Sequence, residues 1–321
     1  MADKKISEFS SLSSLSDSDI CLVNSNNATF KTTFGTIKSF IKAAIPTGVK
    51  GSAESSYRIG NVNITLDNIG TGTAGFHNSI FRGKNLGTSV TSAQWTAIGN
   101  GTFDDLFIGD YWVINGVTWR IAAFDYWYNT GDTVCTTHHI VIVPDTNLLS
   151  ANGSTTHWLH HEDKSDGAYV GTDFYAGTND NTGKAQCRSK AQSAFGSSHI
   201  LTHRVPFQNS AMSGSTNVGY STAGAWYDSD IDIMSEPMVY GSKIFADVKC
   251  GGAIPNMFAI DNSQLPLFAL AHSFICNRAL WWLRDVVSAT YFAGVYLHGT
   301  CHYFGASSSW VGVRPAFGIR A

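Results

Sequence analysis

The sequence is short of charge, of proline and of long apolar runs. Charged residues make up 14% of the 321 residues, the formal net charge is -3, and there are only 7 prolines. Without a basic excess or a polybasic cluster, the chain lacks the usual footprint of a protein that binds nucleic acid or an anionic membrane surface. No apolar run approaches the roughly 18 residues of a membrane-spanning helix. No apolar segment follows Lys4 and Lys5, so we expect no secretory signal.

Paired cysteines are missing as well. The six cysteines are widely scattered, and no two of them form a Cys-x-x-Cys pair. This spacing favours free thiols in a reducing compartment. The six positions are Cys21, Cys135, Cys187, Cys250, Cys276 and Cys301.

Turn-forming and aromatic residues are plentiful instead. The chain has 31 glycines, and aromatic residues account for 12% of it. With serine, threonine and asparagine common throughout, this composition predicts many turns and short strands rather than long helices. The length is enough for a sizeable core. We predict a mixed α+β fold with short strands and long loops.

Residues 1–45 predict a small segment that docks on another chain. Within residues 32–45, apolar side chains recur at the spacing of a short amphipathic helix. This apolar stripe is too small to fold alone, so we interpret residues 1–45 as an anchoring segment. The stripe consists of Phe34, Ile37, Phe40 and Ile41.

Residues 46–77 have the composition of a linker. Gly, Ser, Asn and Thr dominate this segment, with isolated Val and Ile and a short extended piece at 62–66. A single copy cannot bury much apolar surface, whereas parallel copies wound together could. The segment therefore predicts an oligomeric stalk.

Residues 78–321 are rich in aromatic side chains and predict the globular domain. We expect helices over 89–101 and 182–195 and a buried strand over 138–145. Asn115-Gly116 lies between two apolar runs, which is a strong short-range signal for a hairpin. A short helix with an extended end is expected over 229–241. Two further buried segments are expected at 265–270 and 281–286.

The stretch TYFAGVYLHGTCHYFGASSSW, residues 290–310, is the most informative part of the chain. Six of its 21 residues are aromatic, two more are histidines, and no charged side chain occurs between Asp285 and Arg314. Such a stretch is either buried core or a surface that contacts another molecule. Tyrosine and histidine need hydrogen-bond partners when they are buried, and tyrosine beside serine and glycine is typical of binding surfaces. The pattern therefore favours a contact surface.

A two-residue turn at Gly299-Thr300 would fold this stretch into a hairpin. His298 would then oppose Cys301, and Tyr296 would oppose Tyr303. One face would carry Gly294, Tyr296, His298, Cys301 and Tyr303, and the other would carry Ala293, Val295, Leu297, His302 and Phe304. We expect the second face to be core, although His302 fits poorly there.

Two polar segments could hold metal ions, but neither has a known metal-site spacing. His157, His160 and His161 lie within five residues, and neutral imidazoles bind zinc or nickel. Asp173 and residues 179–181 supply oxygen atoms for calcium without the EF-hand spacing. An exposed loop and ordinary turn chemistry explain both segments. We therefore expect no metal and no other cofactor.

Familiar catalytic motifs are absent from the sequence. It contains no G-x-S-x-G, no P-loop and no G-x-G-x-x-G. Cys276 and Cys301 have no cationic neighbour that would activate them. These absences favour a protein that is not an enzyme.

Several segments resemble C-type-lectin-like domains of phage and bacterial surface proteins. In that family the C-terminal end of the domain carries the ligand surface, and retroelements diversify some members at Tyr, Asn, His, Ser and similar positions. The resemblance covers much of residues 80–321. Its segments are FRGKNLGTSVTSAQW, GDYWVINGVTWRIAAFDYW, SSHILTHR, QLPLFAL, WWLRDVVSATYFAGV and GVRPAF.

The resemblance assigns roles to particular positions. A calcium-dependent sugar site would need a Glu-Pro-Asn type triplet, and this chain has Met238 after Glu236-Pro237, so such a site is not expected. The oxidase relatives need two cysteines close in sequence, which Cys276 and Cys301 are not. The implied scaffold is Trp281, Trp282, Leu283, Arg284, Asp285, Val313, Arg314, Pro315 and Phe317. The implied ligand surface is Tyr291, Tyr296, His298, His302, Tyr303 and Trp310, where His302 enters from the family pattern alone.

The first 75 residues resemble the N-terminal segments of phage tail-fibre and head-fibre proteins, followed by the linker found after such segments. Those segments attach the fibre to the virion, and phage fibres are usually trimers. The resemblance therefore implies a homotrimer that is assembled in the host cytoplasm and joins other virion proteins through residues 1–45.

Three hypotheses about function follow. The first is a non-enzymatic virion fibre or receptor-binding protein that attaches to a host-surface glycan or protein, without nucleic acid and without membrane insertion. The second is a purely structural head decoration or baseplate component, whose aromatic end packs on another virion protein. The third is a metal-dependent glycan hydrolase that uses His157, His160 and His161.

Overall fold

The chain forms two compact units, Met1–Thr71 and Gly72–Ala321, in a computed structural model. The expected boundary between residues 77 and 78 falls inside α2 (Ala74–Asn78), the first helix of the second unit. The roles expected for residues 1–45 and 46–77 stay predictions. The described residues are 20–25, 28–33, 56–59, 62–65, 73–149, 183–208, 224–245, 263–287, 291–305, 308 and 310–321.

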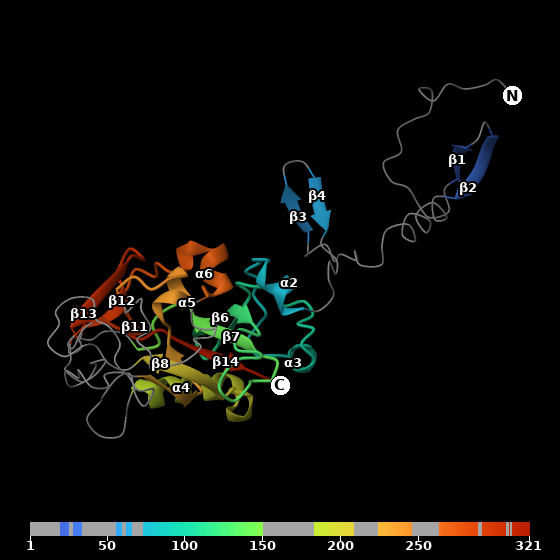
Figure 1. Ribbon diagram of the computed structural model, residues 1–321. Helices are drawn as coiled ribbons and strands as arrows, with labels where there is room; N and C mark the ends of the chain where they lie inside the picture. The colour runs from blue at the N-terminus through green and yellow to red at the C-terminus, as the bar shows by residue number, and fades with distance from the viewer. Residues whose placement is uncertain are drawn as a thin grey trace. The chain divides into compact units, whose positions relative to one another are not determined.

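Within its described residues, the first unit contains two antiparallel hairpins (Figure 1). One joins β1 (Ile20–Ser25) to β2 (Ala28–Thr33), and the other joins β3 (Ser56–Ile59) to β4 (Val62–Thr65). Strand β4 corresponds to the extended piece expected at 62–66. Most of the helix expected over 32–45 lies outside the described residues.

The second unit is built around a five-stranded antiparallel sheet with the strand order β10-β14-β7-β6-β5. Every residue of β7 and β14 is buried, so the middle of the sheet lies in the core. The buried strand expected over 138–145 is thereby confirmed. The strands are β5 (Tyr111–Ile114), β6 (Val117–Phe124), β7 (Ile140–Pro144), β10 (Asp232–Ile233) and β14 (Pro315–Ile319).

The hairpin expected at Asn115-Gly116 is confirmed. Ile114 pairs with Val117, so two residues connect β5 to β6. Asn115 has a φ of 53° and Gly116 a φ of 76°. A type I′ turn needs positive φ at both central residues, and asparagine and glycine adopt that conformation at the lowest cost.

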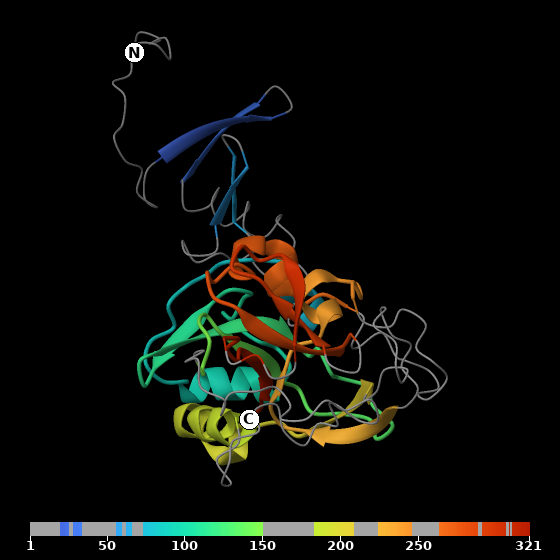
Figure 2. The ribbon, with the colours of Figure 1, turned by 90° about the vertical axis from the view of Figure 1, so that its left-hand side faces the viewer.

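Of the three helices expected in this unit, the two longer ones are confirmed. The helix α3 (Ser92–Gly99) begins with a capping box, in which Thr91 and Gln94 satisfy each other's backbone N–H groups. The longer α4 (Gly183–Phe195) buries Cys187, Ala191 and Phe195 on one face. In both views these two helices lie on one side of the five-stranded sheet (Figures 1 and 2).

The other side of the sheet carries two short helices and a second, three-stranded sheet (Figures 1 and 2). The helices are α5 (Glu236–Tyr240) and α6 (Pro266–Leu270), and the strands are β11 (Trp281–Val286), β12 (Tyr291–Val295) and β13 (Cys301–Gly305). The strands β8 (His203–Gln208) and β9 (Gly224–Ser229) form a separate antiparallel ribbon. Single 3-10 turns lie at Ser197–His199 and His272–Phe274. The described chain is therefore a mixed α+β fold of mostly antiparallel strands, as expected.

The core holds a buried cation as well as aromatic rings. Arg314 is fully buried, and it donates from Nε to the carbonyl of Pro144 at 2.8 Å and from Nη1 to that of Phe274 at 2.7 Å. Its guanidinium lies 5.2 Å from the ring centroid of Trp281. Burial lowers the pKa of Arg314 to about 10, so the side chain still carries its charge at neutral pH.

Candidate contact surface

The ring-rich stretch lies on the three-stranded sheet, in the order β11-β12-β13. The middle strand β12 is anchored in the core, because Phe292, Ala293 and Val295 are buried. The strand β13 is at the edge of this sheet, and His302 and Tyr303 are exposed on it. In the β12–β13 hairpin, β12 is therefore the buried strand, and β13 is the strand that faces solvent.

The two-residue turn expected at Gly299-Thr300 is wrong. Val295 pairs with Cys301, so five residues rather than two connect β12 to β13. His298 lies inside this connection, 6.0 Å from Tyr296 between ring centroids, and does not oppose Cys301. Because the register differs by an odd number of residues, each side chain of β13 faces the side opposite to the expected one.

Contacts with distant segments explain the longer connection. Gly299 has a φ of +82°, and a Cβ atom there would lie 3.1 Å from the Cβ of Cys276. The phenol of Tyr240 donates to the carbonyl of Gly299 at 3.0 Å, and the thiol of Cys276 donates to the carbonyl of Leu297 at 3.2 Å. These contacts hold the loop in one shape. A loop that is already ordered loses less conformational entropy when it binds a partner.

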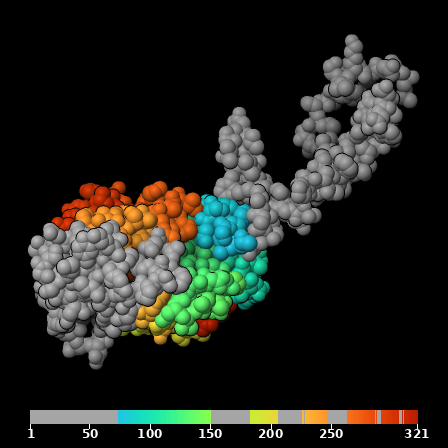
Figure 3. Space-filling model, in the orientation of Figure 1, coloured from blue at the N-terminus to red at the C-terminus, as the bar shows by residue number. Residues whose placement is uncertain are grey.

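All six side chains expected on the ligand surface are exposed. The described chain has eight exposed large hydrophobic residues, and five of them fall within residues 291–310. Trp310 is the most exposed of the eight, at 69% of its surface. In the space-filling view this C-terminal part of the chain lies at the surface (Figure 3). The five are Tyr291 at 42%, Tyr296 at 36%, Leu297 at 38%, Tyr303 at 41% and Trp310.

The exposed rings lie on both faces of the β12–β13 hairpin. On one face, Tyr291 and Tyr303 meet edge to face with their ring centroids 5.4 Å apart. On the other face, the ring of His302 lies 5.4 Å from Tyr296 and 5.0 Å from Phe304. The prediction that Tyr296 and Tyr303 lie on the same face of the hairpin is therefore wrong. His302, which was expected to fit poorly in the core, lies at the surface beside Tyr296.

A buried carboxylate braces the hairpin from the inside. Glu236 is fully buried and accepts the backbone N–H groups of Ile244 and Phe245 at 2.9 and 3.0 Å. It also accepts the thiol of Cys301 at 3.3 Å. Burial and the charge of Glu236 raise the pKa of the Cys301 thiol, which therefore stays protonated. Phe245 in turn packs edge to face on Tyr303 at 5.2 Å.

These supporting residues could not be found from the sequence. Ser235 and Pro237 signal the start of α5, and the Ser235 hydroxyl accepts the N–H of Met238 at 3.3 Å. No local pattern links Glu236 to Cys301, or Tyr240 to Gly299, because each pair is about sixty residues apart. Only the folded chain brings them together.

The residues expected in the scaffold lie in β11, which pairs with β12, and at the start of β14. Eight of the nine are buried, and Asp285 is partly buried. Asp285 accepts the N–H of Glu236 at 2.5 Å, which places it at the start of α5. Its pKa is raised by burial and by the charge of Glu236. The family role of these positions stays a prediction. The buried eight are Trp281, Trp282, Leu283, Arg284, Val313, Arg314, Pro315 and Phe317.

The described residues lend no support to the zinc or calcium sites that two polar segments of the sequence suggested. His157, His160 and His161 lie outside them, as do Asp173 and residues 179–181. Among the residues that the structure does describe, no group of three or more His, Cys, Asp or Glu side chains could hold a metal ion. Both carboxylate oxygens of Glu236 are engaged by backbone N–H groups, so this residue is not offered to a calcium ion at the surface.

Cys135, Cys187, Cys276 and Cys301 are free thiols, and the side chains of Cys21 and Cys250 lie outside the described part of the chain. None of the helices in the described ranges is long and apolar enough to cross a membrane.

Comparison with known proteins identifies no relative. No protein family, no curated protein and no solved structure matches this chain.

Proposed function

We propose that the chain is a phage virion fibre or receptor-binding protein whose aromatic surface attaches to a host-surface glycan or protein. The aromatic surface is defined as Tyr291, Tyr296, His298, His302, Tyr303 and Trp310. One observation carries the proposal: most of the exposed large hydrophobic side chains of the described chain are gathered within residues 291–310. Scattered single apolar residues are ordinary, whereas a concentration of them marks an interaction site.

The chemistry of these side chains supports binding rather than catalysis. Tyrosine and tryptophan offer large, rigid contact areas with one polar group, and they lose little conformational entropy when bound. The only thiol on the hairpin, Cys301, is held protonated by its surroundings. The aromatic surface therefore provides contact area and hydrogen bonds, and we assign it no reaction.

A C-type-lectin-like fold for residues 78–321 is part of the proposal. The mixed α+β arrangement, the buried positions around Trp281 and Arg314, and the exposed hairpin near the C-terminus support it. Residues 1–45 would anchor the chain to the particle, and three chains would assemble through residues 46–77. Weak contacts at each aromatic surface would then add up on one particle.

Adsorption to bacterial cells tests the proposal. Fluorescently labelled full-length protein is mixed with a panel of candidate host strains, and its depletion from the supernatant is measured. We expect at least one strain to retain the protein. The variant Tyr296→Ala/Tyr303→Ala/Trp310→Ala should lose at least 10-fold in apparent affinity, because rings of this kind dominate binding energies.

Two controls separate binding from folding. The variant Leu270→Ala removes an equally exposed apolar side chain at the end of α6, 43% exposed, and should bind as the parent does. Circular dichroism should show the same unfolding transition for all three proteins. Equal adsorption by the parent and the triple variant would refute the site assignment. If no strain retains the folded parent, the structural alternative is favoured, in which the rings pack on another virion protein.

A further inference from the structure

The outer strands of the two larger sheets differ in how their edges are covered. The outer edge of β5 is paired by residues 84–87, whose carbonyls accept the N–H groups of Tyr111 and Val113 at 2.9 Å. The outer edge of β11 is covered in the same way, because Gly312 accepts the N–H of Trp282 at 3.0 Å. By contrast, β12 is the single strand that pairs with β13 in the described part of the chain (Figure 1). Proteins usually protect such an edge with lysine, proline or a covering segment, and β13 contains neither lysine nor proline.

Alternate backbone groups of β13 point away from β12. The N–H of Tyr296 donates to the carbonyl of Thr300 at 2.8 Å, which makes these residues a hydrogen-bonded pair. Hydrogen-bonded and non-hydrogen-bonded pairs alternate along an antiparallel ladder, so the N–H and C=O groups of Cys301 and Tyr303 point to the outer side. In the described ranges, none of these four groups is bonded to another backbone group. The edge therefore offers two donors and two acceptors.

The imidazole of His302 covers the outward groups of Tyr303. Its Nδ1 atom lies 2.8 Å from the backbone nitrogen of Tyr303 and 2.6 Å from the carbonyl oxygen of the same residue. One nitrogen either accepts from the N–H or donates to the carbonyl, so it satisfies one of the two groups at a time. A paired strand supplies an acceptor and a donor together. His302 is exposed, and exposed side chains change rotamer readily, so an incoming strand can displace it.

The exposed rings lie on both sides of this edge. Tyr291 and Tyr303 occupy one face of the β12–β13 hairpin, and Tyr296 and His302 occupy the other. A partner that lies flat on one face would contact only the rings of that face. A strand that is added beside β13 places alternate side chains on the two faces, so it would contact the rings of both.

We propose that the partner of the aromatic surface is a polypeptide strand that pairs with the outer edge of β13. The strand would be uncharged, because no charged side chain occurs between Asp285 and Arg314. It would be apolar at alternate positions, where its side chains meet the exposed rings. The inference rests on the proposed function, because it identifies the partner of the same surface as a protein rather than a glycan.

A yeast-displayed library of random octapeptides tests the inference on the full-length protein without any host cell. We expect the enriched peptides to be uncharged, with apolar residues at alternate positions. Hydrogen exchange at the amides of Cys301 and Tyr303 should slow at least 10-fold in the complex, because both amides gain an acceptor. The amides of His302 and Phe304 already face β12 and should change less.

Two substitutions at Tyr303 separate the backbone from the ring. Tyr303→Ala removes the ring and keeps the N–H, whereas Tyr303→Pro removes both. Proline is tolerated in an edge strand where the N–H faces solvent. Tyr303→Pro should bind the enriched peptides at least 10-fold more weakly than Tyr303→Ala, because it lacks a donor and its ring blocks the approaching strand. If Tyr303→Pro unfolds at a lower temperature than Tyr303→Ala, the amide exchange of the parent decides.

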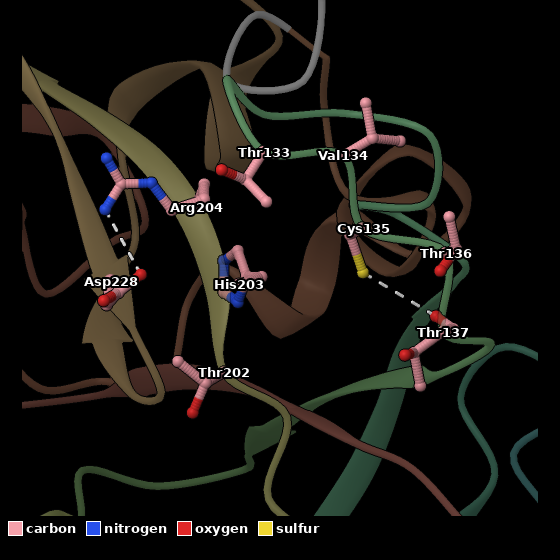
Figure 4. A pocket seen from close by; sticks show the side chains of 9 residues that line it. All are labelled: Thr133, Val134, Cys135, Thr136, Thr137, Thr202, His203, Arg204 and Asp228. Carbon is pink, nitrogen blue, oxygen red and sulfur yellow. Dashed lines mark hydrogen bonds and ion pairs between the residues drawn. The ribbon is translucent and has the colours of Figure 1, made fainter.

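Val134→Ala controls for contacts with exposed apolar side chains in general. Val134 is 54% exposed, which is more than Tyr303 at 41%. It lines a pocket formed by residues 133–137, residues 202–204 and Asp228, and no residue of β12 or β13 lines this pocket (Figure 4). This variant should bind the enriched peptides as the parent does.

The inference is refuted if no octapeptide binds, if the two Tyr303 variants bind equally, or if exchange at Cys301 and Tyr303 is unchanged in the complex. It is also refuted if exchange there slows with protein concentration alone, because a second copy of the chain would then occupy the edge. Host cells that retain the parent but lose both Tyr303 variants equally would support attachment and refute the strand. Cells that never retain the parent would count against the proposed function, and the octapeptides would still test the strand.

Discussion

Single residues connect the exposed hairpin to the interior. Glu236 joins α5 to the thiol of Cys301, and Tyr240 joins the same helix to the carbonyl of Gly299. Asp285 closes the network by accepting the N–H of Glu236. The aromatic surface therefore depends on polar atoms that no ligand would touch. Substitutions at these positions should change the stability of the protein and the order of residues 296–300, and leave the exposed side chains of the aromatic surface chemically unchanged.

Asp285 should make the free energy of unfolding fall as the pH rises. Burial and the charge of Glu236 raise the pKa of Asp285 from 3.8 to about 7. Between these values the folded protein binds more protons than the unfolded chain, so the stability contributed by this group is lost as the pH rises from about 4 to about 7. The difference in the free energy of unfolding between the variant Asp285→Asn and the parent should therefore change with pH. It should increase in favour of the variant by on the order of 2–3 kcal/mol as the pH rises from 4.5 to 7.5.

Urea unfolding of both proteins at several pH values measures this difference. The comparison between the variant and the parent cancels the contributions of other titrating groups, such as Asp105 and Asp230, whose pKa values are lowered by neighbouring arginines. A difference that stays constant across the pH range would contradict the assignment.

Tyr240→Phe should loosen the hairpin loop. It removes the hydrogen bond to Gly299 and leaves a carbonyl without its donor, at a cost of about 1 kcal/mol in the free energy of unfolding. Chemical denaturation measures the cost, and amide exchange of residues 296–300 should become faster. The matched control is Tyr291→Phe, whose hydroxyl has no described partner. Equal losses in the two variants would show that the Tyr240 bond does not hold the loop.

At the level of elements, two hairpins show what a sequence can predict. Asn115-Gly116 specifies its own turn, because both residues tolerate positive φ and the pairing of β5 with β6 follows from the turn. Gly299-Thr300 resembles such a turn but is part of a longer loop. Its shape depends on Tyr240 and Cys276, which are distant in sequence. Local turn chemistry therefore predicts the first register correctly and the second incorrectly.

A pair of glycine variants tests the importance of the first turn. Gly116 and Gly75 both have open space around the position of a Cβ atom, but only Gly116 has a positive φ. Gly116→Ala should lose about 1 kcal/mol, because alanine resists this conformation. Gly75→Ala lies in α2 and should be neutral or gain up to about 1 kcal/mol. Thermal unfolding compares the two, and effects of the same sign would contradict the explanation.

Sequence patterns predicted which side chains are exposed better than how they are grouped. The absence of charge between Asp285 and Arg314 and the number of polar rings indicated an accessible stretch, and the six predicted side chains are all exposed. Their division between two faces depends on the strand register, which the core decides.

At the scale of the whole molecule, the chain divides between Thr71 and Gly72. The second unit has its own continuous core, from Ile98 in α3 to Ile319 in β14. The first unit contains only two short hairpins in its described residues. This division suits the proposal that residues 1–77 anchor and assemble the particle component while the second unit carries the aromatic surface.

The oligomeric state tests this division of labour. We expect full-length protein to sediment with three times the 34.7 kDa mass of one chain, and a fragment of residues 72–321 to sediment as a folded monomer. Analytical ultracentrifugation measures both masses. A monomeric full-length chain, or a trimeric fragment, would contradict the role proposed for the first 77 residues.

Hydroxyl-radical footprinting of the full-length protein on cells that retain it tests the central claim most directly. Mass spectrometry reports the oxidation of each side chain in free and cell-bound protein. The account predicts strong protection of Tyr296, Tyr303 and Trp310 on bound cells, with unchanged oxidation of Leu270. If other side chains are protected on bound cells while these three rings are oxidised as fast as in free protein, the cell is bound elsewhere. The aromatic surface would then not be the attachment site.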